Sequence, residues 1–154
     1  MKYNIAIPSY KRAETVRTKT LALLEKYKVD PKNVTIFVAD DNELKDYQKS
    51  LSNSPYKDNI VVGIRGMGAI RNFIRSYYKE GEYIVNLDDD LSSIERKSKE
   101  NEKKLEPIED IHKELIEPMY EAMIQNNNKL CGVYAASNPF FMKYQPKVGL
   151  YYCI

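Results

Sequence analysis

Residues 83–90 read Tyr-Ile-Val-Asn-Leu-Asp-Asp-Asp, an apolar run that ends in three carboxylates. The run has the length and composition of a buried strand, which delivers the acidic groups of residues 88–90 at its carboxyl end. One helix length earlier stands the segment 66–72, Gly-Met-Gly-Ala-Ile-Arg-Asn. Carboxylates gathered in this way attract a divalent cation, and a nearby arginine can hold the phosphates that the cation bridges. Together the two segments predict a site for a metal ion and a diphosphate.

Strand-like and helix-like segments alternate before this run. The strand-like segments are residues 5–8, 34–39, 60–64 and 83–87, and helical spacing of apolar residues covers 16–27, 44–51 and 70–77. Asp30-Pro31 is expected to end the first helix, and Gly81 the third. Strands that alternate with helices predict an α/β fold, with a mostly parallel, Rossmann-like sheet flanked by helices and right-handed crossovers.

The character of the chain changes after Leu91. Residues 95–106 are mostly Lys, Glu, Asn and Ser, which predicts a mobile loop or a solvated helix. A helix is expected from Ile108 to about Asn126, and Pro118 must kink it or start a new helix because proline has no backbone donor. Two strand-like runs follow, at residues 130–135 and 148–153. Because the sequence stops inside the second run, we expect the domain to be incomplete at its carboxyl end.

Composition narrows the class of protein. The 154 residues are 43% hydrophobic and 30% charged, which is typical of one globular domain. Lys and Arg (24) nearly balance Asp and Glu (22), so the net charge of +2 argues against a polyanion binder that depends on overall basicity. The chain lacks the pattern of a signal peptide and a window long enough to span a bilayer, which predicts a cytoplasmic protein. Cys131 and Cys153 stand in apolar runs, as buried reduced thiols do.

The loops that follow the four expected strands should share one edge of a parallel sheet, which is where open α/β sheets bind ligands. These loops are residues 8–12, 40–42, 65–72 and 88–90. They carry both cations and carboxylates, a mixture that suits a ligand with phosphates and hydroxyls, such as a nucleotide. The charged residues are Lys11, Arg12, Arg65, Arg71, Asp40, Asp41, Asp88 and Asp90.

The same loops resemble the nucleotide-binding half of the GT-A glycosyltransferases, especially the family-2-like group. The resemblance covers residues 4–94 and rests on four segments in the family's order: Pro8-Ser9-Tyr10-Lys11-Arg12, Val38-Ala39-Asp40-Asp41, Gly68-Ala69-Ile70-Arg71-Asn72 and residues 81–90. The spacing between Arg71-Asn72 and the acidic triplet is its most specific element. The chain is also similar to short glycosyltransferase-like proteins of phages, some of them associated with modified DNA bases; a phage protein would act in the host cytoplasm.

The resemblance implies one GT-A-like domain over residues 1–154. Residues 1–94 would form the nucleotide-sugar-binding part, and residues 95–154 a partial acceptor-side part. The implied activity is metal-dependent transfer of a sugar from a nucleoside-diphosphate donor, with UDP-type donors favoured, to an acceptor hydroxyl. A modified DNA base, a polysaccharide and a protein side chain all stay open as acceptors, and the sequence leaves the oligomeric state undefined.

The family's pattern also implies roles for particular residues. The first and third acids of its D-x-D motif contact the donor ribose and the metal, and here these are Asp88 and Asp90. Mn²⁺ or Mg²⁺ is the implied cation, with Asp90 the leading ligand. The resemblance also implies donor-binding residues. Asp41 or Asp40 would contact the base or the ribose, and Pro8 and Tyr10 would flank the base. Arg71 would contact the diphosphate, and the set also includes the neighbouring Arg12 and Asp89.

The chain departs from the family in its later half. Inverting members take a general base and often a metal-binding histidine from that half, whereas the only histidine here, His112, falls in an expected helix and no Asp or Glu follows Ser137. We therefore name no catalytic base. The alternative function is a non-catalytic or truncated nucleotide-sugar-binding protein.

Structural explanations compete with these roles. Aspartates after a strand often cap the following helix, and for Asp40 and Asp41 this explanation weighs about as much as ligand binding. Arg71 could pair with an acid on its own helix. A nucleotidyltransferase is disfavoured because residues 8–12 are not rich in glycine. A dinucleotide dehydrogenase is disfavoured because Gly66-x-Gly68 follows the third strand and lacks the third glycine.

Overall fold

The computed structural model describes residues 2–133 and 138–142. The chain forms two compact units, Met1–Ser92 and Ser93–Ile154. The strand-like run at 148–153 lies outside the described residues, and so do the last two residues of the run at 130–135.

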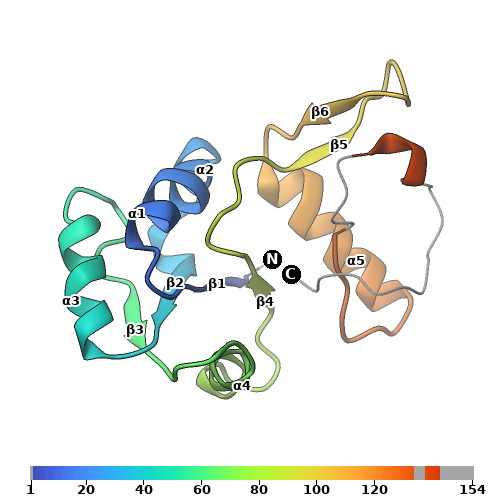
Figure 1. Cartoon of the computed structure of the whole chain (residues 1–154). Helices are drawn as coiled ribbons and strands as arrows, with labels where there is room; N and C mark the ends of the chain where they lie inside the picture. Colours follow the sequence, from blue (N-terminus) through green and yellow to red (C-terminus); the bar gives the residue numbers. More distant parts are fainter. Residues whose placement is uncertain (1, 134–137, 143–154) are drawn as a thin grey trace. The chain divides into compact units, whose positions relative to one another are not determined.

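The first unit is built on a four-stranded parallel sheet in the order β3-β2-β1-β4 (Figure 1). The strands are β1 (Asn4–Pro8), β2 (Val34–Val38), β3 (Ile60–Val62) and β4 (Ile84–Asn86). Their apolar, β-branched residues suit a sheet that is covered on both faces. The predicted fold class, a Rossmann-like α/β sheet flanked by helices, is confirmed.

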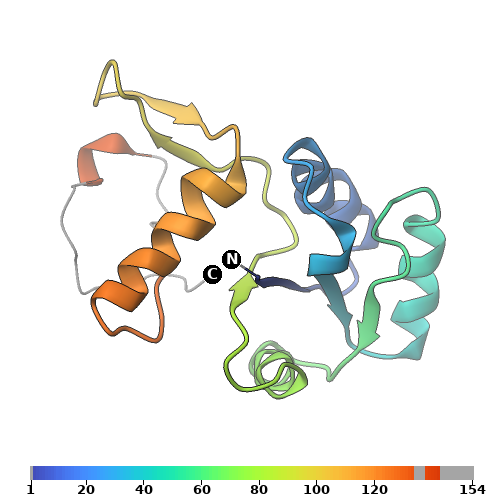
Figure 2. The ribbon, with the colours of Figure 1, turned by 180° about the vertical axis from the view of Figure 1, so that it is seen from behind.

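Helices connect the strands of this sheet. A continuous helical stretch, α1 (Ala13–Val16), the π-helical turn η1 (Arg17–Leu21) and α2 (Ala22–Lys26), follows β1. The 3₁₀ turn η2 (Pro31–Asn33) leads into β2, α3 (Asp41–Ser50) follows β2, and α4 (Met67–Tyr77) follows β3. Figures 1 and 2 show α4 on one side of the sheet and α1 and α2 on the other.

The core beneath α4 shows how the sequence selects this arrangement. Ile70 and Ile74, one turn apart on α4, are buried against Ala6 of β1 and Phe37 of β2. Alternate residues of the strands, such as Ile5, Ile7 and Ile36, are fully buried as well. Because neighbouring residues of a strand point to opposite faces, burial of both sets means that the sheet is enclosed by helices on both sides.

The end of α4 differs from the sequence-based expectation. The helix ends at Tyr77, and Tyr78 already has extended backbone with ψ of 151°. Gly81 was expected to end the helix, but it lies in the turn that leads into β4, where its φ of 88° is a conformation that glycine adopts without strain. The prediction that Gly81 ends the third helix is therefore wrong.

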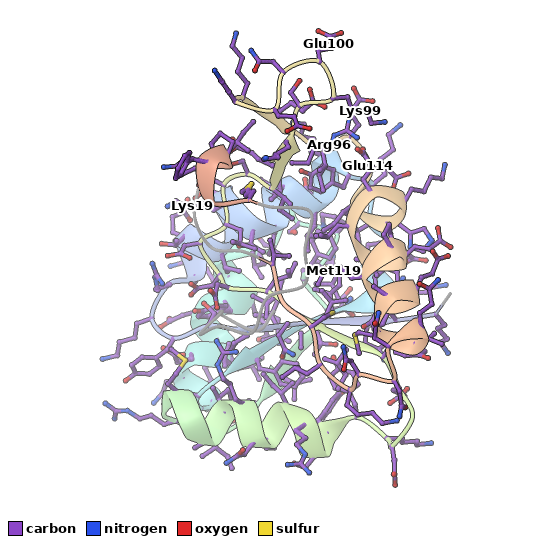
Figure 3. All side chains as sticks on the ribbon, turned by 90° about the vertical axis from the view of Figure 1, so that its right-hand side faces the viewer. Lys19, Arg96, Lys99, Glu100, Glu114 and Met119 are labelled. Atoms are coloured by element: carbon purple, nitrogen blue, oxygen red, sulfur yellow. The ribbon has the colours of Figure 1, made fainter. Side chains whose placement is uncertain are left out.

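The second unit begins with a hairpin, where a mobile loop or a solvated helix was expected. β5 (Glu95–Lys97) pairs with β6 (Leu105–Pro107) in antiparallel register, and the amide of Ile108 extends the pairing to the carbonyl of Ile94 at 3.1 Å. Arg96 pairs across the two strands with Glu106 and also contacts Glu114, which lies beyond the hairpin, each at 3.0 Å. Figure 3 shows Arg96 and Glu114 pointing toward each other. A segment of polar composition therefore forms a hairpin with paired charges, and the expectation of a loop or a solvated helix was wrong.

The helix of the second unit starts later than expected. It begins around His112 rather than Ile108, with the π-helical turn η3 (His112–Ile116) followed by α5 (Glu117–Gln125). Pro118 stands in the first turn of α5, directly after the π-helical turn η3, so the helical stretch continues past the residue that has no backbone donor. Residues 130–133 carry no strand, contrary to expectation, and η4 (Pro139–Phe141) is a 3₁₀ turn.

None of the helices in residues 2–133 and 138–142 has the length and apolar character that crossing a bilayer would need.

Candidate functional site

The strand order reverses between β1 and β4. From β1 the chain adds β2 and then β3 on one side, and it then returns to place β4 on the other side of β1. The loops that follow β1 and β4 therefore diverge from neighbouring strands at a topological switch point, where open α/β sheets bind their ligands. These loops hold Ser9 to Arg12 on one side and Asp88 to Asp90 on the other.

Arg12 joins the two loops across this switch point. Its Nη1 donates to Oδ1 of Asp89 at 2.8 Å, and its Nη2 donates to Oδ2 of Asp90 at 2.9 Å. Arg71 of α4 approaches the same triplet more loosely, with its Nη2 3.4 Å from Oδ1 of Asp88. The structure thus brings together the acidic triplet, Arg12 and Arg71, all predicted site residues.

The three aspartates occupy different environments. The side chain of Asp89 is only 8% exposed, and the Ser9 hydroxyl donates to its Oδ2 at 2.6 Å. Burial raises the pKa of Asp89, and the contacts with Ser9 and Arg12 partly offset that rise. By contrast, the side chains of Asp88 and Asp90 are 55% and 42% exposed. Asp89 therefore serves internal contacts, while Asp88 and Asp90 present carboxylate oxygens to the solvent.

A buried threonine anchors the backbone of the acidic turn. The Thr20 hydroxyl donates to the carbonyl of Asp88 at 2.7 Å and accepts from the amide of Leu91 at 2.9 Å. Thr20 is fully buried in the helical stretch that follows β1. One side chain therefore satisfies a backbone group of the first aspartate and a backbone group just after the triplet, and it limits how the turn can rearrange.

Two residues of α3 hold the loop after β1. The Tyr47 hydroxyl lies 2.6 Å from Oγ of Ser9 and accepts from the backbone amide of Arg12 at 3.1 Å. Oε1 of Glu43 accepts from the amide of Lys11 at 2.8 Å. Lys11 has left-handed backbone, with φ of 54°. Burial raises the pKa of Tyr47, so its hydroxyl stays protonated. Glu43 and Tyr47 are four residues apart and share one face of the helix.

Sequence reasoning missed Thr20, Glu43 and Tyr47. The available signal was that Glu43 falls four residues before Tyr47 and eight before Leu51, on the helix face that packs inward. A carboxylate on a buried face needs partners, which predicts hydrogen bonds to nearby backbone donors.

The aspartates after β2 serve α3 directly. Asp40 is the N-cap of α3, where its Oδ1 accepts from the amides of Asn42 at 3.0 Å and Glu43 at 3.1 Å. Asp41 is exposed in the first turn of the same helix. The capping explanation therefore holds for Asp40, and contact between either residue and a ligand stays a prediction.

Tyr10 links the loops after β1 and β3. Tyr10 is 37% exposed. Nζ of Lys11 lies 5.4 Å from the centroid of its ring and Cζ of Arg65 lies 5.3 Å from it, and both distances permit cation–π attraction. Pro8, the last residue of β1, is half-buried just before this loop. The exposed ring and its two cations form a surface that could carry a planar, anionic group.

The predicted metal ligands can be tested for chemical fit. Within the described ranges, no three or more His, Cys, Asp or Glu side chains converge on one point as a complete metal-binding group would. Asp88 and Asp90 nevertheless offer the hard oxygen ligands that Mg²⁺ and Mn²⁺ prefer, and such ions commonly take only one or two carboxylates and complete their shell from phosphates and water. The residues fit a cation that arrives with a diphosphate better than a cation alone.

These features define an α/β domain with a Rossmann-like sheet and a charged ligand edge at its switch point. A family model described as TET-associated glycosyltransferase matches residues 3–147, and the chain belongs to this family. The searches of curated proteins and of solved structures found no match. The predicted relation to glycosyltransferases is confirmed at the level of the family, while the family-2-like assignment stays a prediction.

Proposed function

We propose that this protein transfers a sugar from a nucleoside-diphosphate donor to an acceptor hydroxyl, and that a divalent cation assists the transfer. Membership of a glycosyltransferase family supports the transferase class. The observation that carries the finer proposal is the arrangement at the switch point, where the exposed carboxylates of Asp88 and Asp90 stand beside Arg12 and Arg71.

The diphosphate lies between the two arginines in this proposal. A guanidinium offers paired donors that match the oxygens of a phosphate, and both arginines start from contacts with carboxylates that they can exchange for phosphates. The first turn of α4 adds backbone amides, and Gly68 leaves open space beside them, because a Cβ placed there would meet no heavy atom within 4 Å. The chain's own residues thus hold the leaving group from two sides.

Asp90 and Asp88 hold Mn²⁺ or Mg²⁺ in this account. When bound, the cation neutralises the charge that the diphosphate gains as it leaves. The acceptor oxygen forms a bond to the anomeric carbon and gives up its proton to the solvent, since no residue is assigned as the base. The bond from that carbon to the phosphate oxygen breaks, and the nucleoside diphosphate departs with the electron pair. Arg12 and Arg71 stabilise the same negative charge as it develops.

The nucleoside end of the donor lies against the loops after β1 and β2. The ring of Tyr10 stacks on the base, Pro8 flanks it, and Asp41 accepts hydrogen bonds from the base or the ribose. Asp40 is the weaker candidate because it already caps α3. A UDP-type donor is favoured, as the resemblance implies.

The acceptor needs a hydroxyl group. The unmodified DNA bases carry no aliphatic hydroxyl, so a DNA acceptor would have to be a modified base, such as one with a hydroxymethyl group. The resemblance to phage proteins supports testing such DNA first, with a polysaccharide and a protein side chain as the other candidates.

A non-catalytic nucleotide-sugar-binding protein is the second candidate. Inverting members of the resembled family take their base from the later half of the domain, and no residue of this sequence is assigned that role. In this case the switch point would bind the donor without transferring its sugar.

Thermal unfolding tests the proposal. The full chain is melted with a panel of nucleotide sugars, with and without Mn²⁺, and the screen is repeated on Asp90→Ala and on the control Asp46→Ala, which changes an exposed aspartate of α3. Stabilisation that needs both nucleotide and Mn²⁺, and that Asp90→Ala alone abolishes, supports the site.

Mass spectrometry of acceptors then separates the two functions. A sugar-sized mass increase on hydroxymethylated DNA, absent with unmodified DNA, supports the enzyme. Binding without transfer to any acceptor supports the binder, and no response to any nucleotide with metal would remove both.

A further inference from the structure

Arg12 already supplies a positive charge where the proposed function places a metal ion. Its two guanidinium nitrogens contact Asp89 and Asp90 at 2.8 and 2.9 Å, one nitrogen to each acid. These are the short distances of charge-assisted hydrogen bonds. An arginine guanidinium stays charged in proteins at every ordinary pH, so Arg12 brings a permanent positive charge to these two acids.

The backbone and the side chain of Arg12 are held differently. The backbone amide donates to the hydroxyl of the buried Tyr47, and the preceding amide of Lys11 donates to Glu43. The side chain is 48% exposed and extends across the switch point to the acids. Rotation about its side-chain bonds could therefore move the guanidinium without disturbing the loop, whose position is set by α3.

The two acids differ in how they could release the guanidinium. Asp89 is buried, and it keeps the hydrogen bond from Ser9 and needs the nearby charge. Asp90 is 42% exposed and can exchange one cationic partner for another in contact with solvent. A divalent cation on Asp90 would lie beside the guanidinium, and the two positive charges would repel each other unless an anion stands between them.

We propose that Arg12 is a built-in counter-ion that couples metal binding to diphosphate binding. Without ligand, the guanidinium neutralises Asp89 and Asp90 and opposes a metal ion that arrives alone. When a diphosphate is present, its oxygens accept the hydrogen bond that Asp90 loses, and Asp90 becomes free to bind the metal. This inference rests on the proposed function and adds to it a reason for metal and donor to bind together.

The coupling must be reciprocal. If a diphosphate raises the affinity for the metal by some factor, the metal raises the affinity for the diphosphate by the same factor. Couplings of this kind are typically about 5–150-fold, so a factor of about ten or more is expected in the wild-type protein.

Isothermal titration calorimetry of the full chain with Mn²⁺, in the absence and in the presence of saturating UDP, measures this coupling. The variants are Arg12→Ala and Arg12→Gln; the second keeps a hydrogen-bond donor near the buried Asp89 and guards against loss of folding, which circular dichroism checks. Arg17→Ala is the matched control, because Arg17 is an exposed arginine in the helical stretch that begins just after Arg12, and it pairs with Glu14 instead.

The inference predicts that wild type and Arg17→Ala bind Mn²⁺ weakly alone and about tenfold or more tightly with UDP. Both Arg12 variants should bind Mn²⁺ alone more tightly than wild type, with a coupling factor that falls to a few-fold. If Mn²⁺ and UDP bind to wild type but the Arg12 variants bind Mn²⁺ alone no better, Arg12 is not a counter-ion and the inference fails while the proposed function stands. If wild type binds no Mn²⁺ even with UDP, the proposed function and the inference fail together.

Discussion

Tyr47→Phe tests the network that holds the loop after β1. The substitution removes one oxygen atom and keeps the buried ring. That oxygen lies 2.6 Å from Oγ of Ser9 and accepts from the amide of Arg12 at 3.1 Å. The loop of Ser9 to Arg12 would then lose the contacts that join it to α3 at two points.

The expected cost follows from the two lost contacts. Each hydrogen bond contributes about 0.5–1.5 kcal/mol net, so Tyr47→Phe should lower the free energy of unfolding by roughly 1–3 kcal/mol. In a chain of this size a loss of about 1 kcal/mol lowers Tm by roughly 2–4 °C, and the expected decrease is therefore about 2–12 °C. The stabilisation that UDP and Mn²⁺ give together should also shrink, because Arg12 is less firmly placed.

Tyr56→Phe is the matched control. Tyr56 is as deeply buried as Tyr47, burial raises its pKa to about 12, and its hydroxyl donates a single hydrogen bond, to the carbonyl of Val29 at 3.2 Å. Its loss should cost about 1 kcal/mol and leave the response to UDP and Mn²⁺ unchanged. Urea unfolding followed by far-UV circular dichroism gives the free energies, and thermal melts with ligand give the response.

The reasoning is refuted if Tyr47→Phe costs no more than Tyr56→Phe and keeps the full ligand response. In that case the hydroxyl of Tyr47 would not help to hold the loop, and the position of Arg12 would depend only on its contacts with Asp89 and Asp90.

Three further predictions concern packing, backbone strain and pH. Gly63→Ala should lower the free energy of unfolding by about 1–3 kcal/mol, because the added Cβ would lie 2.5 Å from Cδ1 of Ile70. Gly68→Ala in α4 should leave that free energy unchanged or raise it by up to about 1 kcal/mol, because a Cβ there would meet no heavy atom within 4 Å. Urea unfolding measures both variants. Lys11→Gly should stabilise by up to about 1 kcal/mol in the same assay, because Lys11 has φ of 54° and glycine adopts that conformation freely; a clear loss of stability would show that the lysine side chain outweighs the strain. Hydrogen bonds from the amides of Asp110 and Glu109 lower the pKa of Glu114 below its ordinary value of 4.5, so its stabilising contribution is complete above that pH and is lost as pH falls through the lowered value. Stability measured at about pH 6 and about pH 3 should therefore differ less in Glu114→Gln than in wild type, and an equal difference would contradict this assignment.

The alternation of strand and helix in the first unit was predictable for a physical reason. Strands enclosed on both faces need continuous runs such as residues 34–38, and a helix on one face of a sheet needs apolar residues one turn apart, as Ile70 and Ile74 are. Both patterns are local in the sequence. Once the sheet is parallel, its topology places the loops after the strands on one edge, so the meeting of Arg12 and Arg71 with the acidic triplet could be anticipated.

The hairpin at residues 95–107 could not be recognised in the same way. Its strands are short and mostly charged, and Arg96 finds its partners across the ladder at Glu106 and beyond it at Glu114. Stabilisation by pairs that are distant in sequence leaves no periodic apolar signal. Composition alone therefore favoured a loop or a solvated helix.

The supporting residues of the site escaped prediction for a related reason. Glu43, Tyr47 and Thr20 act through hydrogen bonds with Lys11, Ser9, Arg12 and the backbone of Asp88 and Leu91, which are 32 to 71 positions away in the sequence. Which loop a helical side chain reaches depends on how the helix is rotated and shifted on the sheet. Asp89 is buried while Asp88 and Asp90 are exposed, and this difference within the triplet is visible only in the three-dimensional structure.

The most direct measurement of the central claim is a crystal structure of the full chain grown with UDP and Mn²⁺, in which anomalous scattering locates the manganese. The account predicts manganese bound to a carboxylate oxygen of Asp90 at about 2.1 Å, the distance typical of Mg²⁺ sites, with the diphosphate against Arg12 and Arg71. A nucleotide bound away from the switch point, or manganese on other residues with Arg12 still holding Asp90, would contradict it.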